Sequence, residues 1–491
     1  MTERAGGARE AAVVVGAGPN GLAAAVTLAL AGLRVTVLEA ADEIGGGLRS
    51  GELSVPGVLF DHCSSTHVMG AGSPFLRTLD LAAYGLEWRR AEIDLAHPLD
   101  SGTAGALYRS VARTADGLGA DGPAWERLFG PPAADAEVLL DEVMRPLVKI
   151  PRHPVRLARF GLHALQPATL IARRFRTEAA RGLFGGAAAH LFGPLTQPLA
   201  ASIGLMIIAA GHRYGWPVAK GGSAALARAL AALLEDAGGR IETGVRIHSL
   251  DQLPPAATVL LDLAPAAAAA VIGDRLPPRV RRAYIRHRHG PAAFKLDLAV
   301  EGGVPWRAEP CRRAGTVHLG GSFEQIAHAE RAVFRGRMPE RPFLLVSQQY
   351  LADPGRSAGT VHPVSTYAHV PHGYRGDATA AMLAQFERFA PGTRERVVAA
   401  TATSTAALER GNPNLVGGDI IGGANTPLRL AMRPRVALDP YRTGVPGVFL
   451  CSAATWPGAG AHGMCGHNAA RSALRALGRE WPLNARPPHG S

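Results

Sequence analysis

The stretch that decides the fold is AAVVVGAGPNGLAAAVTLALAGLRVTVLE, residues 11–39. An apolar run, an alanine-rich segment and a second apolar run predict a strand at 11–15, a helix at 21–31 and a strand at 34–38. The turn between the first strand and the helix follows the pattern GxGxxG, which is a weak signal when it stands alone. In this strand–turn–helix context it predicts a dinucleotide-binding βαβ unit.

The residues of this turn have separate tasks in cofactor binding. Gly16 allows a tight turn, Gly18 lets the backbone approach a pyrophosphate, and Gly21 permits close packing of the helix. With Asn20 they form the predicted phosphate site, at the N-terminus of the helix. Glu39 ends the second strand and offers a carboxylate to ribose hydroxyls. Because an acid there repels a 2′-phosphate, FAD or NAD is favoured over NADP.

The segment after Glu39 resembles the second signature of the glutathione-reductase-like flavoproteins, E-x6-GG-x-x-R/S. Gly46 and Gly47 stand at the paired glycines and Ser50 at the last position, with Arg49 beside it as the nearby arginine. In that family the paired glycines and the arginine pack against the pyrophosphate and the ribityl chain. The resemblance therefore implies FAD, and the alternative for Arg49 is a solvated loop arginine.

Two later segments resemble further cofactor contacts of the same flavoproteins. GRIETGVRI at 239–247 matches the strand whose backbone meets adenine, which puts that contact at Ile247. GVFLCSAATWPGAGAHGMCG at 447–466 resembles the flavin-closing motif, in which a strand, a PGxG turn and a helix N-terminus present N–H donors and a positive dipole to the flavin. The flavin contacts that this motif implies are Ser452, Gly463 and Met464.

These motifs in this order resemble the phytoene-desaturase-like branch of the flavin-containing amine oxidase superfamily. HRYGWPVAKGGS at 212–223 adds a resemblance to bacterial phytoene dehydrogenase-like oxidoreductases. The resemblance spans nearly the whole chain and implies non-covalently bound FAD. The chain departs from the family at Ala453-Ala454, where members often carry an acidic contact to the ribityl hydroxyls. No second GxGxxG follows a strand, so a built-in NAD(P)H domain is not expected.

Two residues are candidates for catalysis. FKLDLAV at 294–300 resembles the amine-oxidase strand whose lysine reaches flavin N5 through a water, which implies that role for Lys295. Strand alternation puts Asp297 on the same face, so an ordinary ion pair is the alternative. His462 lies in the predicted flavin-side turn and is an acid–base candidate near neutral pH. Other histidines that could equally be interior residues are His62, His190 and His212.

The composition describes an ordered chain with several domains. It has 491 residues, of which 47% are apolar and 19% charged. The net charge of +12 comes from dispersed arginines without basic runs interleaved with aromatics, so nucleic-acid binding is not expected. The four cysteines form no CxxC pair, and no metal site is predicted. The first ten residues lack an apolar signal core, so a cytoplasmic location is expected. Peripheral contact with a membrane surface is compatible with that location.

The predicted fold is α/β, with a glutathione-reductase-like, FAD-binding Rossmann domain that is discontinuous in sequence. Its segments are 1–72, 217–280 and 435–482. A second, substrate-binding domain with a mixed sheet plus helices takes 73–216 and 281–434.

The predicted function is removal of a hydride from an apolar substrate, by C–C desaturation or a related oxidation of an isoprenoid- or lipid-like molecule. The apolar stretch 183–210, broken by Pro194 and Pro198, is compatible with the wall of such a pocket. A flavin amine oxidase is the alternative enzyme, against which the aromatic content of 6% weighs, because an amine site generally wants an aromatic cage. A non-catalytic, flavin-bound interaction protein is the alternative from another class. Oxygen and a quinone are both compatible electron acceptors, and the sequence leaves the oligomeric state open.

Overall fold

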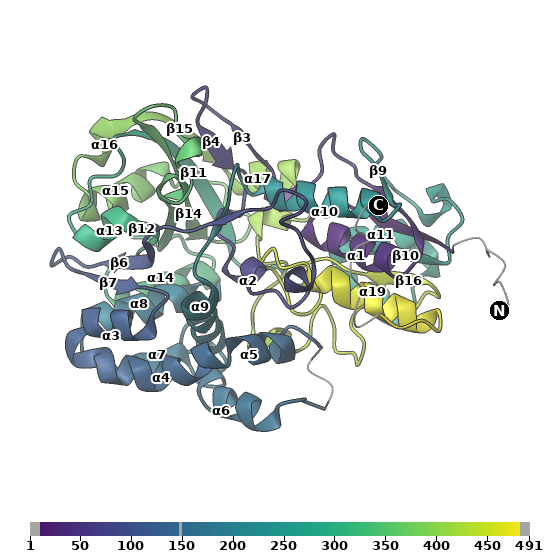
Figure 1. Cartoon of the computed structure of the whole chain (residues 1–491), viewed down its shortest axis with the longest axis horizontal. Coiled ribbons are helices and arrows are strands. Elements are labelled where there is room, and N and C mark those ends of the chain that lie inside the picture. The colour runs from purple at the N-terminus through teal and green to yellow at the C-terminus, as the bar shows by residue number, and fades with distance from the viewer. Residues whose placement is uncertain (1–9, 147–149, 482–491) are drawn as a thin grey trace.

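The computed structural model describes residues 10–146 and 150–481, which form two α/β parts side by side (Figure 1). One part is built on a five-stranded sheet in which every neighbouring pair is parallel. In spatial order its strands are β16 (Val448–Leu450), β10 (Thr258–Leu261), β1 (Ala11–Val15), β2 (Arg34–Leu38) and β9 (Arg240–Glu242). The strands come from three separate regions of the chain, as a discontinuous Rossmann domain requires.

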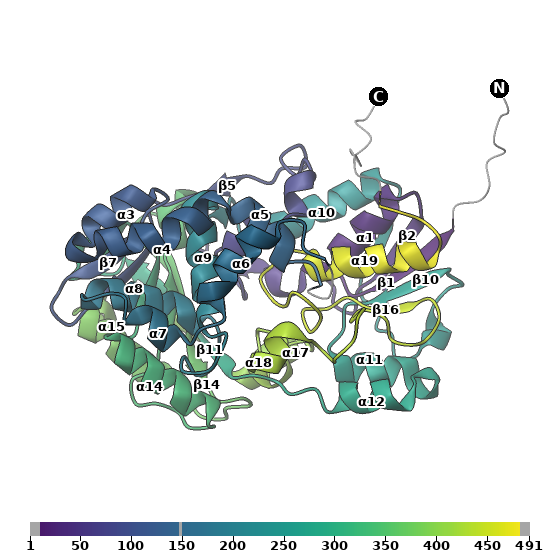
Figure 2. The ribbon, with the colours of Figure 1, turned by 90° about the horizontal axis from the view of Figure 1, so that it is seen from below.

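Helices cover both faces of this sheet (Figure 2). On one face lie α1 (Pro19–Leu30), α10 (Ala224–Asp236) and α19 (Met464–Ala476), and on the other α11 (Pro265–Ile272) and α12 (Pro278–Ile285). Alternate side chains of β1 point to opposite faces of the sheet. Ala12 and Val14 belong to one hydrophobic core, and Val13 and Val15 belong to another. This double burial explains the uninterrupted apolar run in the sequence.

The helix after the glycine turn begins two residues earlier than the sequence pattern predicts. Pro19 is its first residue and Gly18 its N-cap. A proline is suited to this position, because its ring fixes a helical φ and the first helical N–H has no partner within the helix. The N-terminus of α1 therefore lies directly at the GxGxxG turn.

The second part contains a seven-stranded mixed sheet. All neighbouring strands are antiparallel except β6 and β12, which are parallel. Its strands in spatial order are β15 (Val397–Thr403), β11 (Ala292–Glu301), β14 (Val361–Val370), β13 (Leu344–Ser347), β12 (Ala314–Leu319), β6 (Ile93–Pro98) and β7 (Ala104–Leu107). The predicted fold class, a parallel Rossmann sheet with a second domain of mixed sheet plus helices, is confirmed.

The predicted apolar stretch 183–210 forms the end of α8 (Glu178–Ala189) and most of α9 (Ala201–Tyr214), two helices that pack on each other. Two short two-stranded sheets pair β3 (Ser50–Glu52) with β4 (Leu59–Asp61), and β5 (Trp88–Arg89) with β8 (Val218–Ala219). The remaining α-helices are α2 (Val68–Ala71), α3 (Val111–Gly117), α4 (Gly122–Ala134), α5 (Ala136–Val143), α6 (Pro154–Ala164), α7 (Ala168–Ala172), α13 (Glu309–Arg313), α14 (Phe323–Phe334), α15 (Thr379–Phe389), α16 (Thr393–Arg396), α17 (Thr405–Gly411) and α18 (Pro427–Ala431). Among the helices of the described ranges, none has the length and apolar character needed to cross a bilayer.

Candidate cofactor and active site

A cleft of about 440 Å³ opens at the carboxyl ends of β1, β2 and β10. Ligands of open parallel sheets bind at this edge. Its lining comes from residues within 15–20, 38–41, 46–49, 63–64, 245–248, 262–271, 410–422 and 452–461, together with His289. The predicted cofactor residues that line it are Gly16, Gly18, Asn20, Glu39, Gly46, Gly47, Arg49, Ile247 and Ser452.

The glycine turn brings β1 and α1 into close contact. A Cβ on Gly21 would lie 2.0 Å from the carbonyl oxygen of Gly16, so Gly21 packs the helix onto the turn and does not line the cleft. Gly16 itself has a φ of 101°, a conformation that suits glycine. The turn therefore exposes backbone, rather than side chains, at the N-terminus of α1. Such an end provides N–H donors and a favourable dipole for a pyrophosphate.

Glu39 is fixed at the end of β2 by the backbone. Its Oε2 accepts the N–H of Ala17 at 2.6 Å, and its Oε1 accepts the N–H of Ala41 at 2.9 Å. Two carboxylate oxygens have about four acceptor sites, so lone pairs remain for hydroxyl donors in the cleft. The position and chemistry suit the ribose contact that the sequence predicts.

Asp262 is a residue of the cleft that the sequence analysis missed. It follows β10, and its Oδ2 accepts the N–H of Gly21 at 2.9 Å, beneath the glycine turn. Burial raises the pKa of Asp262 to about 7, and the charge of Glu39 adds to this rise. In the neutral form this carboxyl adds no negative charge where a pyrophosphate would bind. The available signal was an acid directly after an apolar strand of a parallel sheet.

The second signature packs directly on the first. Gly45 donates its N–H to the carbonyl oxygen of Ala17 at 2.8 Å, and a Cβ on Gly46 would lie 3.2 Å from the Cα of Gly18. Arg49 donates from Nη2 to the carbonyl oxygen of Gly411 at 3.2 Å, while its buried Nε has no hydrogen-bond partner in the described chain. Arg49 is half-buried at the edge of the cleft, and its Nε keeps a donor for an anionic ligand.

The strand predicted to reach Ile247 is shorter in the structure. β9 ends at Glu242, because Gly244 has a φ of 72° and turns the chain out of the sheet. The N–H of Val245 then donates to the carbonyl oxygen of Glu39 at 2.8 Å. Ile247 consequently reaches the cleft from a loop.

The flavin-closing segment differs in detail from its prediction. The Nδ1 of His462 accepts the N–H of Met464 at 3.0 Å, so this histidine occupies the N-terminal end of α19. Burial lowers the pKa of His462 to about 4, and its ring is neutral near neutral pH. The acid–base role of His462 stays a prediction, and the structure gives its ring a contact with the first N–H of α19. A Cβ on Gly463 would lie 2.8 Å from the Cβ of Ala23, so Gly463 packs on α1.

Met464 and Gly463 do not line the cleft, and the N–H of Met464 is already bound to His462. Ser452 does line it, and its buried Oγ has no partner in the described part of the chain. The rest of this end of the cleft is formed by Ala453, Ala454, Ala459, Gly460 and Ala461.

Lys295 lies on β11, 4% exposed, and forms a buried ion pair with Asp297. The other oxygen of that carboxylate, Oδ1, has no hydrogen-bond partner among the described residues. Burial raises the pKa of the Cys63 thiol, and the nearby Lys295 ammonium opposes that rise. Cys63 lines the cleft beside Gly47, so the ion pair lies behind this wall rather than in the lining.

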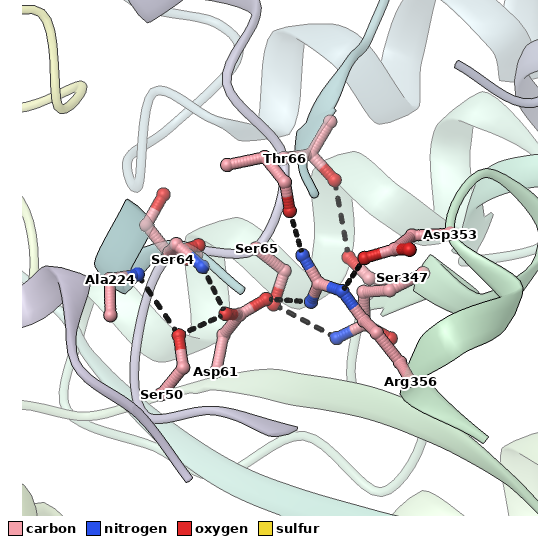
Figure 3. A network of polar contacts seen from close by, with 12 residues as sticks. Ser50, Asp61, Ser64, Ser65, Thr66, Ala224, Ser347, Asp353 and Arg356 are labelled. Atoms are coloured by element: carbon pink, nitrogen blue, oxygen red, sulfur yellow. Dashed lines mark hydrogen bonds and ion pairs between the residues drawn. The ribbon is translucent and has the colours of Figure 1, made fainter. Parts of the chain in front are cut away.

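A buried network connects the two parts of the molecule near Cys63 (Figure 3). The fully buried Arg356 contacts Asp61 at 2.5 Å and Asp353 at 3.2 Å. Burial alone would raise the pKa of Asp61, but the Arg356 charge and hydrogen bonds from Ser223 and Ser50 lower it. The network therefore holds the end of β4, and with it the cleft wall at Cys63, against the mixed-sheet part.

The donor set of the cleft fits FAD. The N-terminus of α1, the free Nε of Arg49 and the unpartnered Oγ of Ser452 offer donors, and Glu39 offers an acceptor.

Residues 20–353 match the family described as flavin containing amine oxidoreductase. An oxidoreductase from Methanosarcina mazei superposes with a TM-score of 0.61 at 16% identity, over 96% of this chain and 100% of the other. Putrescine oxidase bound to putrescine gives 0.58 at 18% identity, over 96% and 99%. Cyclohexylamine oxidase from Brevibacterium oxydans gives 0.57 at 17% identity, over 96% and 100%. No curated protein matches the chain.

Proposed function

This chain belongs to the flavin-containing amine oxidoreductase family, and on that premise we propose that it oxidises an apolar, isoprenoid- or lipid-like substrate. It is an FAD-dependent oxidoreductase, and the proposal concerns its branch and its substrate. The reaction is a C–C desaturation or a related oxidation, in the phytoene-desaturase-like branch of the family. FAD supplies the hydride acceptor, while the residues of the chain bind, orient and exclude water.

The observation that carries this proposal is the chemistry of the cleft lining. No Phe, Tyr or Trp is among its described residues, and the end near Ser452 is formed by alanines and glycines. The carboxylate of Asp419, which also lines the cleft, accepts hydrogen bonds from His289 and from two backbone N–H groups. The described lining thus offers a cationic amine no aromatic cage, and the Asp419 carboxylate is already engaged.

Four groups have proposed roles toward the cofactor. The N-terminus of α1 binds the pyrophosphate, Glu39 accepts from ribose hydroxyls, and Arg49 donates to an anionic oxygen. Lys295 places a positive charge behind the cleft wall at Cys63, next to its counter-ion Asp297. Its ammonium donates to Asp297, and the proposed role of Lys295 is to stabilise negative charge at this end of the cleft from behind the lining.

A flavin amine oxidase is the second candidate. A specific observation favours it: Lys295 is buried on a strand that resembles the lysine-bearing strand of amine oxidases. The solved structures of similar fold include putrescine oxidase and cyclohexylamine oxidase, although at 17–18% identity they carry the fold alone.

Anaerobic titration of the FAD-loaded protein tests the choice. The titrants are an acyclic isoprenoid polyene in detergent, a primary alkylamine and a diamine. We expect the flavin absorbance to bleach with the polyene and to persist with the amines. Bleaching by an amine alone would replace the proposal with the second candidate. Air admitted afterwards restores the absorbance quickly in an oxidase and slowly in a dehydrogenase.

A further inference from the structure

An exposed helix pair on the mixed-sheet part has an apolar ridge surrounded by arginines. On α6, Val155 and Leu162 are each 70% exposed, and on α7 Leu170 is 45% exposed. Leu165, between the two helices, is 63% exposed. Four large apolar side chains are thus exposed within sixteen residues of sequence, and exposed apolar surface of this kind marks interaction sites.

Helix α6 cannot rotate to bury these side chains, because its opposite face already packs against the protein core. Ala164 is buried, and Phe160 packs against the main hydrophobic core beside α9. Val155 and Leu162 are seven residues apart and therefore project from the same face of the helix, away from that packing. The exposed ridge is thus a fixed feature of the folded protein.

The charged side chains of the segment that carries the ridge are all basic. Residues 151–177 contain no Asp or Glu. Their six arginines are all exposed, namely Arg152, Arg156, Arg159, Arg173, Arg174 and Arg176. In the described chain only Arg156 of these has an acidic partner, Asp135 at 3.4 Å. Apolar side chains flanked by arginines, most of which have no acidic partner in the described chain, suit the boundary between lipid headgroups and acyl chains.

We propose that α6 and α7 form a docking surface for an anionic lipid bilayer. Val155, Leu162, Leu165 and Leu170 enter the acyl boundary, and the flanking arginines contact anionic headgroups. A bilayer is favoured over a protein partner because the complementary charge needed is a uniform negative one, spread over a surface. This inference does not depend on the substrate proposed above, and its test uses binding rather than turnover.

Sedimentation with vesicles tests the proposal on the full, FAD-loaded chain. Vesicles of equal parts phosphatidylglycerol and phosphatidylcholine are compared with vesicles of phosphatidylcholine alone. We expect binding to the anionic vesicles only. The double substitution Val155→Glu/Leu162→Glu should weaken it by roughly a hundred-fold, since each buried aliphatic side chain contributes roughly ten-fold or more. Arg152→Gln/Arg159→Gln should weaken it by roughly twenty-five-fold, about five-fold for each charge.

The control is Val398→Glu. Val398 is 57% exposed on β15, which lies at the upper edge of the molecule in Figure 1, whereas α6 lies at the lower edge. All variants should keep the FAD content and melting temperature of the parent, because the altered side chains are exposed. The proposal is overturned if the parent ignores anionic vesicles, if the Val155→Glu/Leu162→Glu protein binds like the parent, or if Val398→Glu weakens binding equally. A solution dimer that Leu162→Glu dissociates would also overturn it.

Discussion

Replacing Asp262 with Asn tests how a charge of the protein controls cofactor binding. The carboxyl lies at the N-terminus of α1, where its Oδ2 accepts the Gly21 N–H at 2.9 Å. Burial raises the pKa of Asp262 from 3.8 to about 7. A rise of about three units corresponds to about 4 kcal/mol in favour of the neutral acid in the folded state. Asparagine keeps the shape and the acceptor oxygen but cannot ionise.

The sign of the effect follows from the direction of the shift. Because the folded-state pKa of Asp262 is raised, its contribution to stability is fully present below pH 3.8 and is lost as the pH rises through about 7. Relative to Asp262→Asn, the parent should lose up to about 4 kcal/mol across that window. A bound pyrophosphate favours the neutral acid further. The FAD affinity of the parent should therefore fall by up to about ten-fold per pH unit above pH 7, and that of the variant should not.

The assay is fluorescence titration of FAD into deflavinated protein on both sides of pH 7, with thermal unfolding at the same pH values. Asp94→Asn is the matched control. Burial raises the pKa of Asp94 to about 6, but this carboxylate accepts the N–H of Trp216 at 2.8 Å and does not line the cleft. The reasoning is refuted if Asp262→Asn retains the pH dependence of FAD affinity of the parent, or if Asp94→Asn abolishes it equally.

Three further substitutions test other parts of the site. Lys295→Met should slow flavin reduction or reoxidation, measured by stopped-flow absorbance, by about ten-fold to a thousand-fold. Because this substitution leaves the buried Asp297 without its counter-ion, the double variant Lys295→Met/Asp297→Asn controls for lost stability. Unchanged rates in both variants would leave Lys295 only an ion-pair role. Gly21→Ala should abolish FAD binding and folding, because its Cβ would lie 2.0 Å from a backbone oxygen. In Gly47→Ala the new Cβ meets nothing closer than 3.7 Å, so this variant should keep the fold. Equal melting temperatures of the two variants would contradict this. Arg356→Met should lower the free energy of unfolding, measured in urea, by about 3–5 kcal/mol, because Asp61 and Asp353 lose their counter-ion. A loss below about 1 kcal/mol would contradict this role of Arg356.

The parts of the site that the sequence predicts are those encoded locally. The βαβ unit follows from an apolar run, three glycines and a second apolar run within 11–39, all in contact along one strand–turn–helix path. Gly46 and Gly47 were predicted from the resemblance of residues 39–50 to a flavoprotein signature. The structure packs this segment on the first signature, where Gly45 donates to Ala17.

The remaining parts depend on contacts between distant segments. Asp262 reaches the glycine turn because β10 pairs with β1, and no local pattern states which strands are neighbours. Asp61 and Arg356 are 295 residues apart, so their ion pair is invisible to spacing. The sequence predicts that His462 lies in a turn before a helix, as it does. The orientation of its ring, however, is set by the hydrogen bond from the N–H of Met464, which sequence position does not reveal.

Acid precipitation of the purified, full-length protein tests the central claim most directly. The cleft offers donors and an acceptor for a dinucleotide, and the flavin-binding segments meet around it. We predict a yellow protein that releases one FAD per chain into the supernatant, with no colour in the pellet. A colourless protein that takes up no FAD, or colour retained in the pellet through a covalent link, would contradict the account.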